Sequence, residues 1–490
     1  MKLKVKSSGW SAGRPIAIVN DKTATRLTAN VNDRVLIKYK SKKITAVIDI
    51  SSKIADENEI VLSSEILFYL GLKGKEFVDV DIAKKPRAVQ IINKKLGCKT
   101  LSEPEINQII KSVVDNSLTE IEIAFFISAI YKCGMKSEEI VALTRSMFET
   151  GKKLKFPGKI VVDKHSIGGI AGNRTTPIVV SICASAGLTF PKTSSRAITS
   201  AAGTADVIEA VCKVNFSPEE IKKIIHKTNA CMVWGGALGF APADDKIIRV
   251  ESMINIDPEP NLLASILAKK LSVGSKYVLI DIPYGKFAKV NKQEGQNLKE
   301  KFEALGKKFG LKLKAVLTDG SQPIGNGIGP ILEIKDIISV LENKPDCPKD
   351  LKNKSIFLAG QIFELCNKAK KNQGEKLALK ILESGQAFNK FSQIIEAQEG
   401  SLKNLGFAKC QYDILSNKSG KIDFIDNKKI NLLARVAGSP LDKKAGVYLY
   451  KHLKNKISKG EKIMTIYSQS KAKLDDAIHF YNENKIITVE

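Results

Sequence analysis

The sequence has few of the residues that build metal centres and disulfide-rich folds. Its 490 residues include four histidines and eight cysteines, and no two cysteines stand in a CxxC spacing. Structural zinc sites and disulfide-linked folds place these residues in clusters at short spacing. We therefore expect no metal site and no disulfide framework. Scattered cysteines are also typical of proteins in a reducing compartment, which predicts a cytoplasmic location.

Long apolar runs and aromatic side chains are scarce as well. No apolar run reaches the ~20 residues that a membrane-spanning helix needs, and the first ten residues lack the apolar centre of a signal peptide. Aromatic residues make up 6% of the chain, and the lysines are spread along it instead of alternating with them. We expect neither a membrane partner nor a nucleic-acid partner. The formal net charge of +26 is consistent with an anionic substrate.

The length and the changing residue patterns predict a multidomain α/β protein. In chain order we expect a small β-rich domain, a helical domain, a large α/β domain with a central sheet and an α+β domain, over residues 1–86, 87–155, 156–405 and 406–490. About residues 242–272 are expected to join the helical domain. Stretches 32–39 and 71–80 both read as a turn followed by a strand, which indicates an internal duplication. In the last domain we predict a helix over 445–453.

Two loops of the predicted α/β domain combine glycines with anion-binding side chains. The first follows an apolar strand that we expect to end at Val162, and it precedes a buried helix predicted over 176–186. Its residues include Lys164, His165, Ser166, Gly168, Gly169 and Gly172. The second, 193–204, contains hydroxyls, one arginine and one glycine. Such residues also collect in ordinary turns, but two such loops, one of them before a helix N-terminus, favour a phosphate site.

Three motifs resemble those of the thymidine and pyrimidine-nucleoside phosphorylase superfamily, and more closely those of its AMP phosphorylase branch. They are Asp-Lys-His-Ser-x-Gly-Gly at 163–169, Thr-Asp-Gly-Ser-Gln-Pro-Ile-Gly at 318–325 and Ala-Gly-Val-Tyr-Leu at 445–449. The sequence departs from thymidine phosphorylase in the first loop, where Ile167 replaces a threonine and Arg174 follows. The second loop lacks the histidine of that group. Extra hydroxyls and arginines fit a second dianion, the 5′-phosphate of a nucleotide.

The resemblance implies a fold and an activity. Residues 1–86 resemble the double-psi-type barrel of the AMP phosphorylase branch. The implied reaction converts AMP and phosphate into adenine and ribose 1,5-bisphosphate, with CMP and UMP as further substrates, in nucleotide salvage. Phosphate is itself the nucleophile, so no cofactor is implied, and the superfamily predicts a homodimer or larger homo-oligomer. The alternatives are a thymidine or pyrimidine-nucleoside phosphorylase and a basic RNA-binding or assembly protein that has lost catalysis.

A third enzyme class, the anthranilate-type phosphoribosyltransferases, shares a related architecture and needs Mg²⁺. The neighbours Asp244 and Asp245 could suggest such a metal. That class carries an Asp directly after the glycines of the first loop, however, and here Ile170 stands after Gly169. We therefore interpret the acidic pair as structural.

The resemblance also assigns roles to residues. The predicted ligands of the attacking phosphate are Lys164, Ser166, Ser194 and Thr204. Asp257 aligns with the proton donor to the base, which requires burial to raise its pKa, although an Asp before Pro-Glu is also a good helix N-cap. His165 could contact the substrate or shape its loop. Positions aligned with nucleotide contacts are Gly169, Ser195, Arg196, Ala197, Ile198, Thr199, Ser200, Thr204, Ser265, Lys269 and Lys289.

Overall fold

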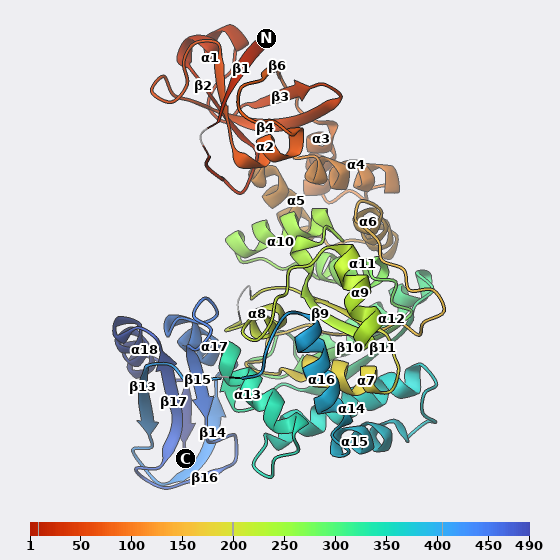
Figure 1. Ribbon diagram of the computed structural model, residues 1–490, viewed down its shortest axis with the longest axis vertical. Coiled ribbons are helices and arrows are strands. Elements are labelled where there is room, and N and C mark those ends of the chain that lie inside the picture. Colours follow the sequence, from red (N-terminus) through yellow and green to blue (C-terminus); the bar gives the residue numbers. More distant parts are fainter. Residues whose placement is uncertain (8, 198–199, 404) are drawn as a thin grey trace. The chain divides into compact units, whose positions relative to one another are not determined.

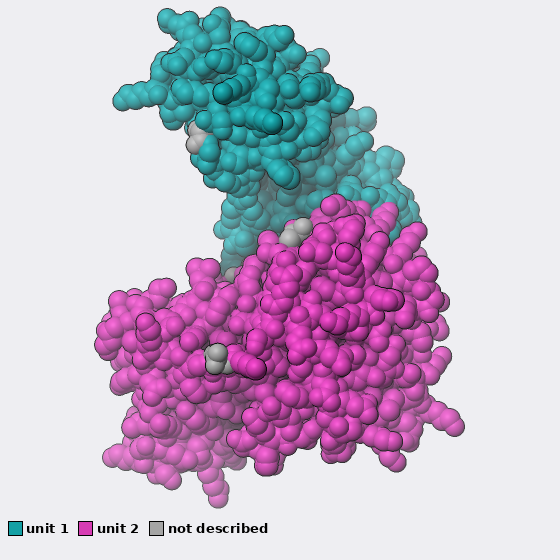
Figure 2. Space-filling model, viewed as in Figure 1, with its two compact units in different colours: residues 1–150, 241–265 teal, residues 151–240, 266–490 magenta. Residues whose placement is uncertain are grey.

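The protein is described here by a computed structural model, which covers residues 1–7, 9–197, 200–403 and 405–490 (Figure 1). These residues form two compact units (Figure 2). The first unit contains residues 1–150 and 241–265, and the second contains 151–240 and 266–490. No helix in the described part of the chain is both long and apolar enough to cross a membrane.

The first unit begins with a closed six-stranded barrel, which confirms the predicted β-rich domain. The barrel order is β1-β5-β2-β4-β3-β6. The strands are β1 (Lys2–Ser7), β2 (Ile16–Val19), β3 (Arg34–Tyr39), β4 (Lys42–Ile50), β5 (Glu59–Leu62) and β6 (Phe77–Ile82), and the helices are α1 (Asp21–Leu27) and α2 (Ser64–Leu70). Alternate residues such as Val35 and Ile37 point into the core. The two stretches with similar sequences form β3 and β6, which pair antiparallel.

Helices follow the barrel in the first unit. They are α3 (Arg87–Leu96), α4 (Glu103–Val114), α5 (Glu120–Cys133), α6 (Ser137–Glu149) and α10 (Pro242–Ile254). Capping boxes at Ser102 and Thr119 begin α4 and α5, because each pairs a hydroxyl with a carboxylate three residues on. Lys246 of α10 donates hydrogen bonds to the carbonyl oxygens of Val113 (2.9 Å) and Val114 (2.8 Å) at the end of α4.

We expected no disulfide framework from the sequence, and this expectation was wrong for one pair of cysteines in this unit. Cys98, just after α3, is bonded to Cys133, the last residue of α5. The two are separated by 35 residues, and no short motif marks them. The other cysteines are free, at positions 183, 212, 231, 347, 366 and 410. The pair comes together because the ends of two packed helices meet.

The second unit contains parallel strands whose carboxyl ends carry the predicted loops. One sheet has the order β11-β10-β7, and a second pairs β8 with β9. These strands are β7 (Val162–Ser166), β8 (Phe190–Ser194), β9 (Ala230–Trp234), β10 (Tyr277–Tyr284) and β11 (Lys312–Asp319). The expectation that the first strand ends at Val162 was wrong, since β7 begins there. The polar residues up to Ser166 continue it because β7 pairs in register with β10.

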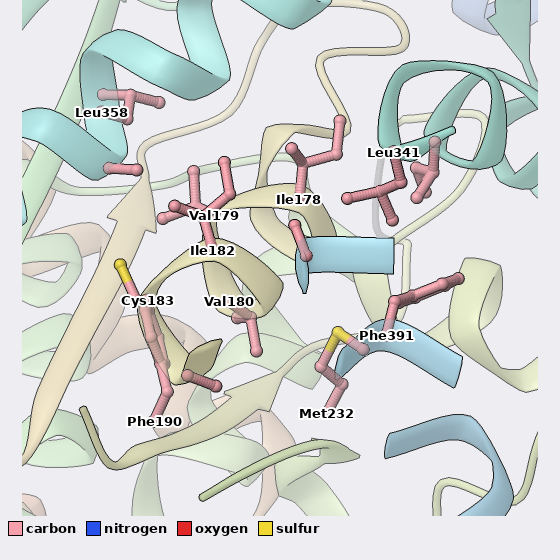
Figure 3. Close-up of a cluster of buried hydrophobic side chains, with 14 of the residues drawn as sticks. Ile178, Val179, Val180, Ile182, Cys183, Phe190, Met232, Leu341, Leu358 and Phe391 are labelled. Atoms are coloured by element: carbon pink, nitrogen blue, oxygen red, sulfur yellow. The ribbon is translucent and has the colours of Figure 1, made fainter. Parts of the chain in front are cut away.

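Helices pack around these strands. They are α7 (Thr175–Ser185), α8 (Thr204–Glu209), α9 (Pro218–Thr228), α12 (Lys292–Lys308), α13 (Pro330–Leu341), α14 (Lys349–Leu365), α15 (Gly374–Glu383) and α16 (Gln386–Ala397). Helix α9 packs in a smaller core, whereas α7, α8 and α13–α16 contribute to one large core. Every residue of α7 from Thr175 to Ala184 is buried, as expected from its apolar sequence. Figure 3 shows Ile178, Val179 and Ile182 of α7 in this core.

The C-terminal part of the second unit is α+β, as predicted. It contains β13 (Cys410–Leu415), β14 (Gly420–Ile425), α17 (Asn427–Val436), β15 (Gly446–Leu449), β16 (Lys456–Ile457), β17 (Lys462–Ser468), α18 (Lys471–Glu483) and β18 (Ile487–Val489). The helix predicted over 445–453 was wrong, because β15 lies there. β15 pairs with β17 and with β12 (Gly327–Ile328), and the backbone at Gly446 is so close to Ile328 that a Cβ would lie 2.2 Å from its carbonyl oxygen.

Candidate active site

The first predicted loop begins at the carboxyl end of β7. Ser166 lies opposite Asp281 of β10 in the parallel register. Gly168 and Gly169 follow with φ values of +88° and +92°, a conformation that residues with a Cβ rarely adopt. A Cβ on Gly169 would lie 2.8 Å from the backbone nitrogen of Lys289. The structure therefore brings together Gly169 and Lys289, two of the predicted substrate-binding residues.

Lys164 belongs to β7, and its side chain is buried against the N-terminus of α7. Its side chain is 1% exposed, and its Nζ donates a 2.9 Å hydrogen bond to Thr175 Oγ1. The same Nζ lies 3.9 Å from Asp281 Oδ2. Burial lowers the pKa of Lys164 to about 8, although the nearby carboxylate of Asp281 opposes the shift. The ammonium is thus mostly charged at neutral pH and lies within the protein, where a charge acts strongly on an anion.

Asp281 is a residue of this site that the sequence analysis missed. Its Oδ1 accepts a 2.6 Å hydrogen bond from Thr318, in the second motif, and its Oδ2 lies 3.3 Å from the Nζ of Lys354. Burial opposes ionisation of Asp281, but the charges of Lys354 and Lys164 outweigh burial and lower its pKa. A single Asp within the apolar strand sequence Val-Leu-Ile-Asp-Ile-Pro was the available signal, because an unpaired carboxylate is costly there.

The second predicted loop is shaped by carboxylates of α8. Arg196 Nη1 lies 3.0 Å from Asp206 Oδ1 and 2.6 Å from Glu209 Oε2, and its guanidinium stacks 4.8 Å from the ring centroid of Trp234. The backbone nitrogens of Ala197 and Gly203 both donate to Asp206 Oδ2. The hydrogen bonds that Arg196 donates to Glu209 raise the pKa of Arg196 above its ordinary value. Arg196 is therefore already engaged by two carboxylates.

Other predicted residues of the second loop have fewer interactions. Ser194 ends β8, and its Oγ is buried without a hydrogen-bond partner among the described residues. Ser200 donates to the carbonyl oxygen of Ala202. Ser195 is exposed, and its carbonyl oxygen accepts a long hydrogen bond from the backbone nitrogen of Ala205. The predicted contacts at Ile198 and Thr199 lie outside the described residues.

Arg174 connects the two loops. Its Nη1 donates to Thr204 Oγ1 at 2.9 Å, and its Nη2 donates to the carbonyl oxygen of Ala202 at 2.8 Å. Its Nε is bonded to Glu333 of α13. Thr175, the next residue, accepts a hydrogen bond from Lys164. The adjacent residues Arg174 and Thr175 at the start of α7 therefore contact two predicted phosphate ligands, Thr204 and Lys164.

Helix α17 supports the loops from the C-terminal part of the unit. Asn427 accepts a hydrogen bond from the backbone nitrogen of Ala171 (3.3 Å) and donates one to the carbonyl oxygen of Gly320 (3.2 Å). Asn431, one turn later, accepts from the backbone nitrogen of Ala201 (2.9 Å). Sequence reasoning missed both residues, because two asparagines in a polar helix give no signal of contacts more than 200 residues away.

His165 is half-buried beside several lysines. Burial, reinforced by the charges of Lys270, Lys192 and Lys269, lowers the pKa of His165 well below its ordinary value. The imidazole is therefore neutral at neutral pH. A neutral imidazole can accept or donate a hydrogen bond to a substrate, but it does not supply a proton as a cationic acid would.

Asp257 and Ser265 belong to the first unit. Asp257 is exposed and lies in the segment just before α11 (Glu259–Ser272), so its unit does not provide the burial that we expected. The first helical hydrogen bond of α11 runs from Leu262 to the carbonyl oxygen of Pro258. Ser265 is buried in α11, which also contains Lys269. The roles assigned to these residues stay predictions.

Comparisons with known proteins agree with this architecture. Three family models match: a glycosyl transferase family helical bundle domain at 89–151, a glycosyl transferase family a/b domain at 158–388 and a pyrimidine nucleoside phosphorylase C-terminal domain at 421–488. The fold also resembles that of anthranilate phosphoribosyltransferase from Thermus thermophilus, with a TM-score of 0.53 and 18% identity over 63% of this chain and 99% of that one. The matched domains, together with the full-length relatives described next, define the class of protein as a pentosyltransferase.

The full-length relatives narrow this class. The chain is 43% identical to the AMP phosphorylase of Methanococcus aeolicus, covering 100% of this chain and 97% of the relative. It is 41% identical to AMP phosphorylase 1 of Archaeoglobus fulgidus, covering 98% and 96%. A putative thymidine phosphorylase of Legionella pneumophila is 39% identical, covering 94% and 89%. The chain belongs to the AMP phosphorylase family, which confirms the predicted family and enzyme class.

Proposed function

We propose that this protein catalyses the phosphorolysis of AMP to adenine and ribose 1,5-bisphosphate. An oxygen of inorganic phosphate forms a bond to C1′ of the ribose while the bond from C1′ to the base breaks, and the departing adenine takes up a proton. The transition state resembles an oxocarbenium ion, as in glycoside hydrolysis. The protein then has three tasks, which are to bind the attacking phosphate, to hold the nucleotide and to protonate the base.

The observation that carries the phosphate part of this proposal is a pair of buried hydroxyls. Ser166 Oγ and Ser194 Oγ are both buried without a hydrogen-bond partner of good geometry in the described part of the chain. Buried hydroxyls nearly always have partners. Both serines were predicted as phosphate ligands. A phosphate oxygen would accept hydrogen bonds from their hydroxyls, while Lys164 supplies the positive charge.

The nucleotide's 5′-phosphate is proposed to bind the second loop through backbone N–H groups and hydroxyls around 194–200. Arg196 would act there mainly by holding the loop in shape, since Asp206 and Glu209 occupy its guanidinium. Asp257 is the proposed proton donor to the base. CMP and UMP as further substrates and a homodimer or larger homo-oligomer are proposed on the same family basis. A cytoplasmic location is proposed because most of the cysteines are free.

A substrate panel tests this function. Purified protein is supplied with phosphate and either AMP, CMP, UMP, adenosine or thymidine, and release of the free base is measured. AMP should be turned over far faster than adenosine, because an anion site built for the 5′-phosphate loses its contacts when that group is missing. Equal rates for adenosine or thymidine and AMP would instead favour a nucleoside phosphorylase. No phosphorolysis of any compound would favour the assembly protein.

A further inference from the structure

Helix α14 carries a buried lysine that no sequence motif includes. The side chain of Lys354 is 9% exposed, whereas Lys349 at the start of the same helix is exposed. Lys354 Nζ makes no hydrogen bond of good geometry within the described residues. Its one ion pair there joins it to Asp281 Oδ2 at 3.3 Å. An ammonium has three N–H donors, so most of its donor capacity is unused.

Asp281 does not balance the charges around it. Its Oδ2 faces Lys354 at 3.3 Å and Lys164 at 3.9 Å, and its Oδ1 is occupied by the hydroxyl of Thr318. One carboxylate thus faces two ammonium groups at short distance, while the charges of Asp319 and Asp350 also act on Lys354 without forming an ion pair with it among the described residues. Ser166 Oγ, which has no well-formed hydrogen bond, lies near enough to Asp281 to help lower its pKa. Two cations and a hydroxyl therefore surround this carboxylate at the end of strands β7 and β10.

We propose that Lys354 is a second lysine ligand of the attacking inorganic phosphate. The ammonium groups of Lys354 and Lys164, which both lie beside Asp281, bind the phosphate together. The inference rests on the proposed function and adds a residue to it. Asp281 orients the two ammonium groups, and the phosphate dianion accepts hydrogen bonds from their remaining N–H donors and from Ser166. A purely structural ion pair would need only one lysine, because burying a second cation costs free energy unless an anion compensates it.

Steady-state kinetics with both substrates varied can test this role. The variants are Lys354→Met, which keeps the length of the side chain without its charge, Lys354→Arg, which keeps the charge, and Lys349→Met as the control on the same helix. For Lys354→Met the KM for phosphate should rise about tenfold or more, the loss expected for a charge-assisted hydrogen bond. Its KM for AMP and its melting temperature should stay near those of the wild type. Lys354→Arg should recover most of the phosphate affinity, and Lys349→Met should match the wild type.

Two results would overturn the inference. One is a KM for phosphate within twofold of the wild type in Lys354→Met. The other is an equal rise in both KM values with a lower melting temperature, as expected of a structural residue. If Lys354→Met does not fold, Lys354→Gln replaces it in the same comparison. Calorimetric titration with inorganic phosphate alone separates this inference from the proposed function, since it measures phosphate binding even if wild-type protein does not cleave AMP.

Discussion

The two predicted anion-binding loops hold their cations in different ways. In the first, Lys164 is almost fully buried, donates to threonine hydroxyls and has its nearest carboxylate at 3.9 Å. In the second, the side chain of Arg196 is 33% exposed, and its guanidinium contacts two carboxylates and an indole ring. Both loops look alike in sequence, because each combines hydroxyls and glycine with at least one basic residue. Their cations nevertheless differ in what they can still bind.

The comparison shows that a basic residue in a loop is available to a substrate only when protein anions have not already saturated it. The ammonium of Lys164 contacts hydroxyls and has no carboxylate closer than 3.9 Å among the described residues, and its desolvated charge favours a bound anion. Arg196 donates three hydrogen bonds to Asp206 and Glu209, so its charge is already paired, and it is therefore a better support for the loop than a ligand. The following changes test that difference, beginning with the largest expected effect.

Lys164→Ala should cause the largest loss. It removes the charge beside the attacking phosphate, and we expect kcat/KM for phosphate to fall a hundredfold or more. Lys159→Ala, at an exposed lysine just before the strand, is the matched control and should behave as wild type. Activity of Lys164→Ala within twofold of the wild type would show that the first loop is not the phosphate site.

In the proposed mechanism the proton for the base comes from outside both loops, and Asp257→Asn tests the residue proposed to supply it. Asn caps a helix about as well as Asp but has no carboxylic proton. The variant should melt like the wild type and bind AMP, while kcat falls roughly a hundredfold. If Asp257→Asn is active and Asp257→Ala melts early, the residue is a structural cap and the proton comes from elsewhere, such as water.

Glu209→Gln probes the saturated arginine directly. The change weakens one of the two carboxylate contacts of Arg196 and leaves the other, at Asp206. If Arg196 supports the loop, loosening it should raise the KM for AMP about tenfold and leave the KM for phosphate within about twofold. A lower KM for AMP would reverse the interpretation, because a released guanidinium would then be binding the 5′-phosphate itself. Lys443, which also contacts Glu209, can be changed to Met as the control for the third partner.

The pH dependence of phosphate binding should give the smallest effect. Burial lowers the pKa of Lys164 to about 8, so the ammonium loses its proton as the pH rises through that value. The KM for phosphate should therefore rise a few-fold between about pH 7.5 and 8.5, where phosphate itself is already mainly a dianion. Lys164→Arg keeps its charge over this range and should give a flatter profile. A wild-type KM that falls with rising pH would contradict the assignment.

The sequence predicted the local parts of this structure better than its long-range contacts. The apolar run before Ala186 gave the buried helix α7 to within one residue at each end, because burial on all sides leaves a continuous apolar signal. The glycines of the first loop were correctly expected to follow a strand, but Lys164, His165 and Ser166 belong to β7 itself and not to the loop. The range 445–453 was misread as a helix because its pairing partners, β12 and β17, lie elsewhere in the chain.

The residues missed at the site share one property. Each of them contacts a part of the site that lies far away in the sequence, and none belongs to a local sequence pattern. They are Asp281, Lys354, Asn427 and Asn431. Lys354 in particular is one lysine in a lysine-rich helix, Lys-Asp-Leu-Lys-Asn-Lys. Only the fold distinguishes Lys354 from Lys349 and Lys352, because Lys354 lies on the side of the helix that contacts Asp281 of β10.

The support that α17 gives to the loops has a consequence for how the protein is made. Synthesis proceeds from the N-terminus, so the loops at 163–174 and 194–204 leave the ribosome long before Asn427 and Asn431. Strand β12 likewise waits for β15 to complete its sheet. A nascent chain therefore carries the residues of its phosphate site without their final hydrogen bonds, and products of premature termination before α17 should be catalytically silent.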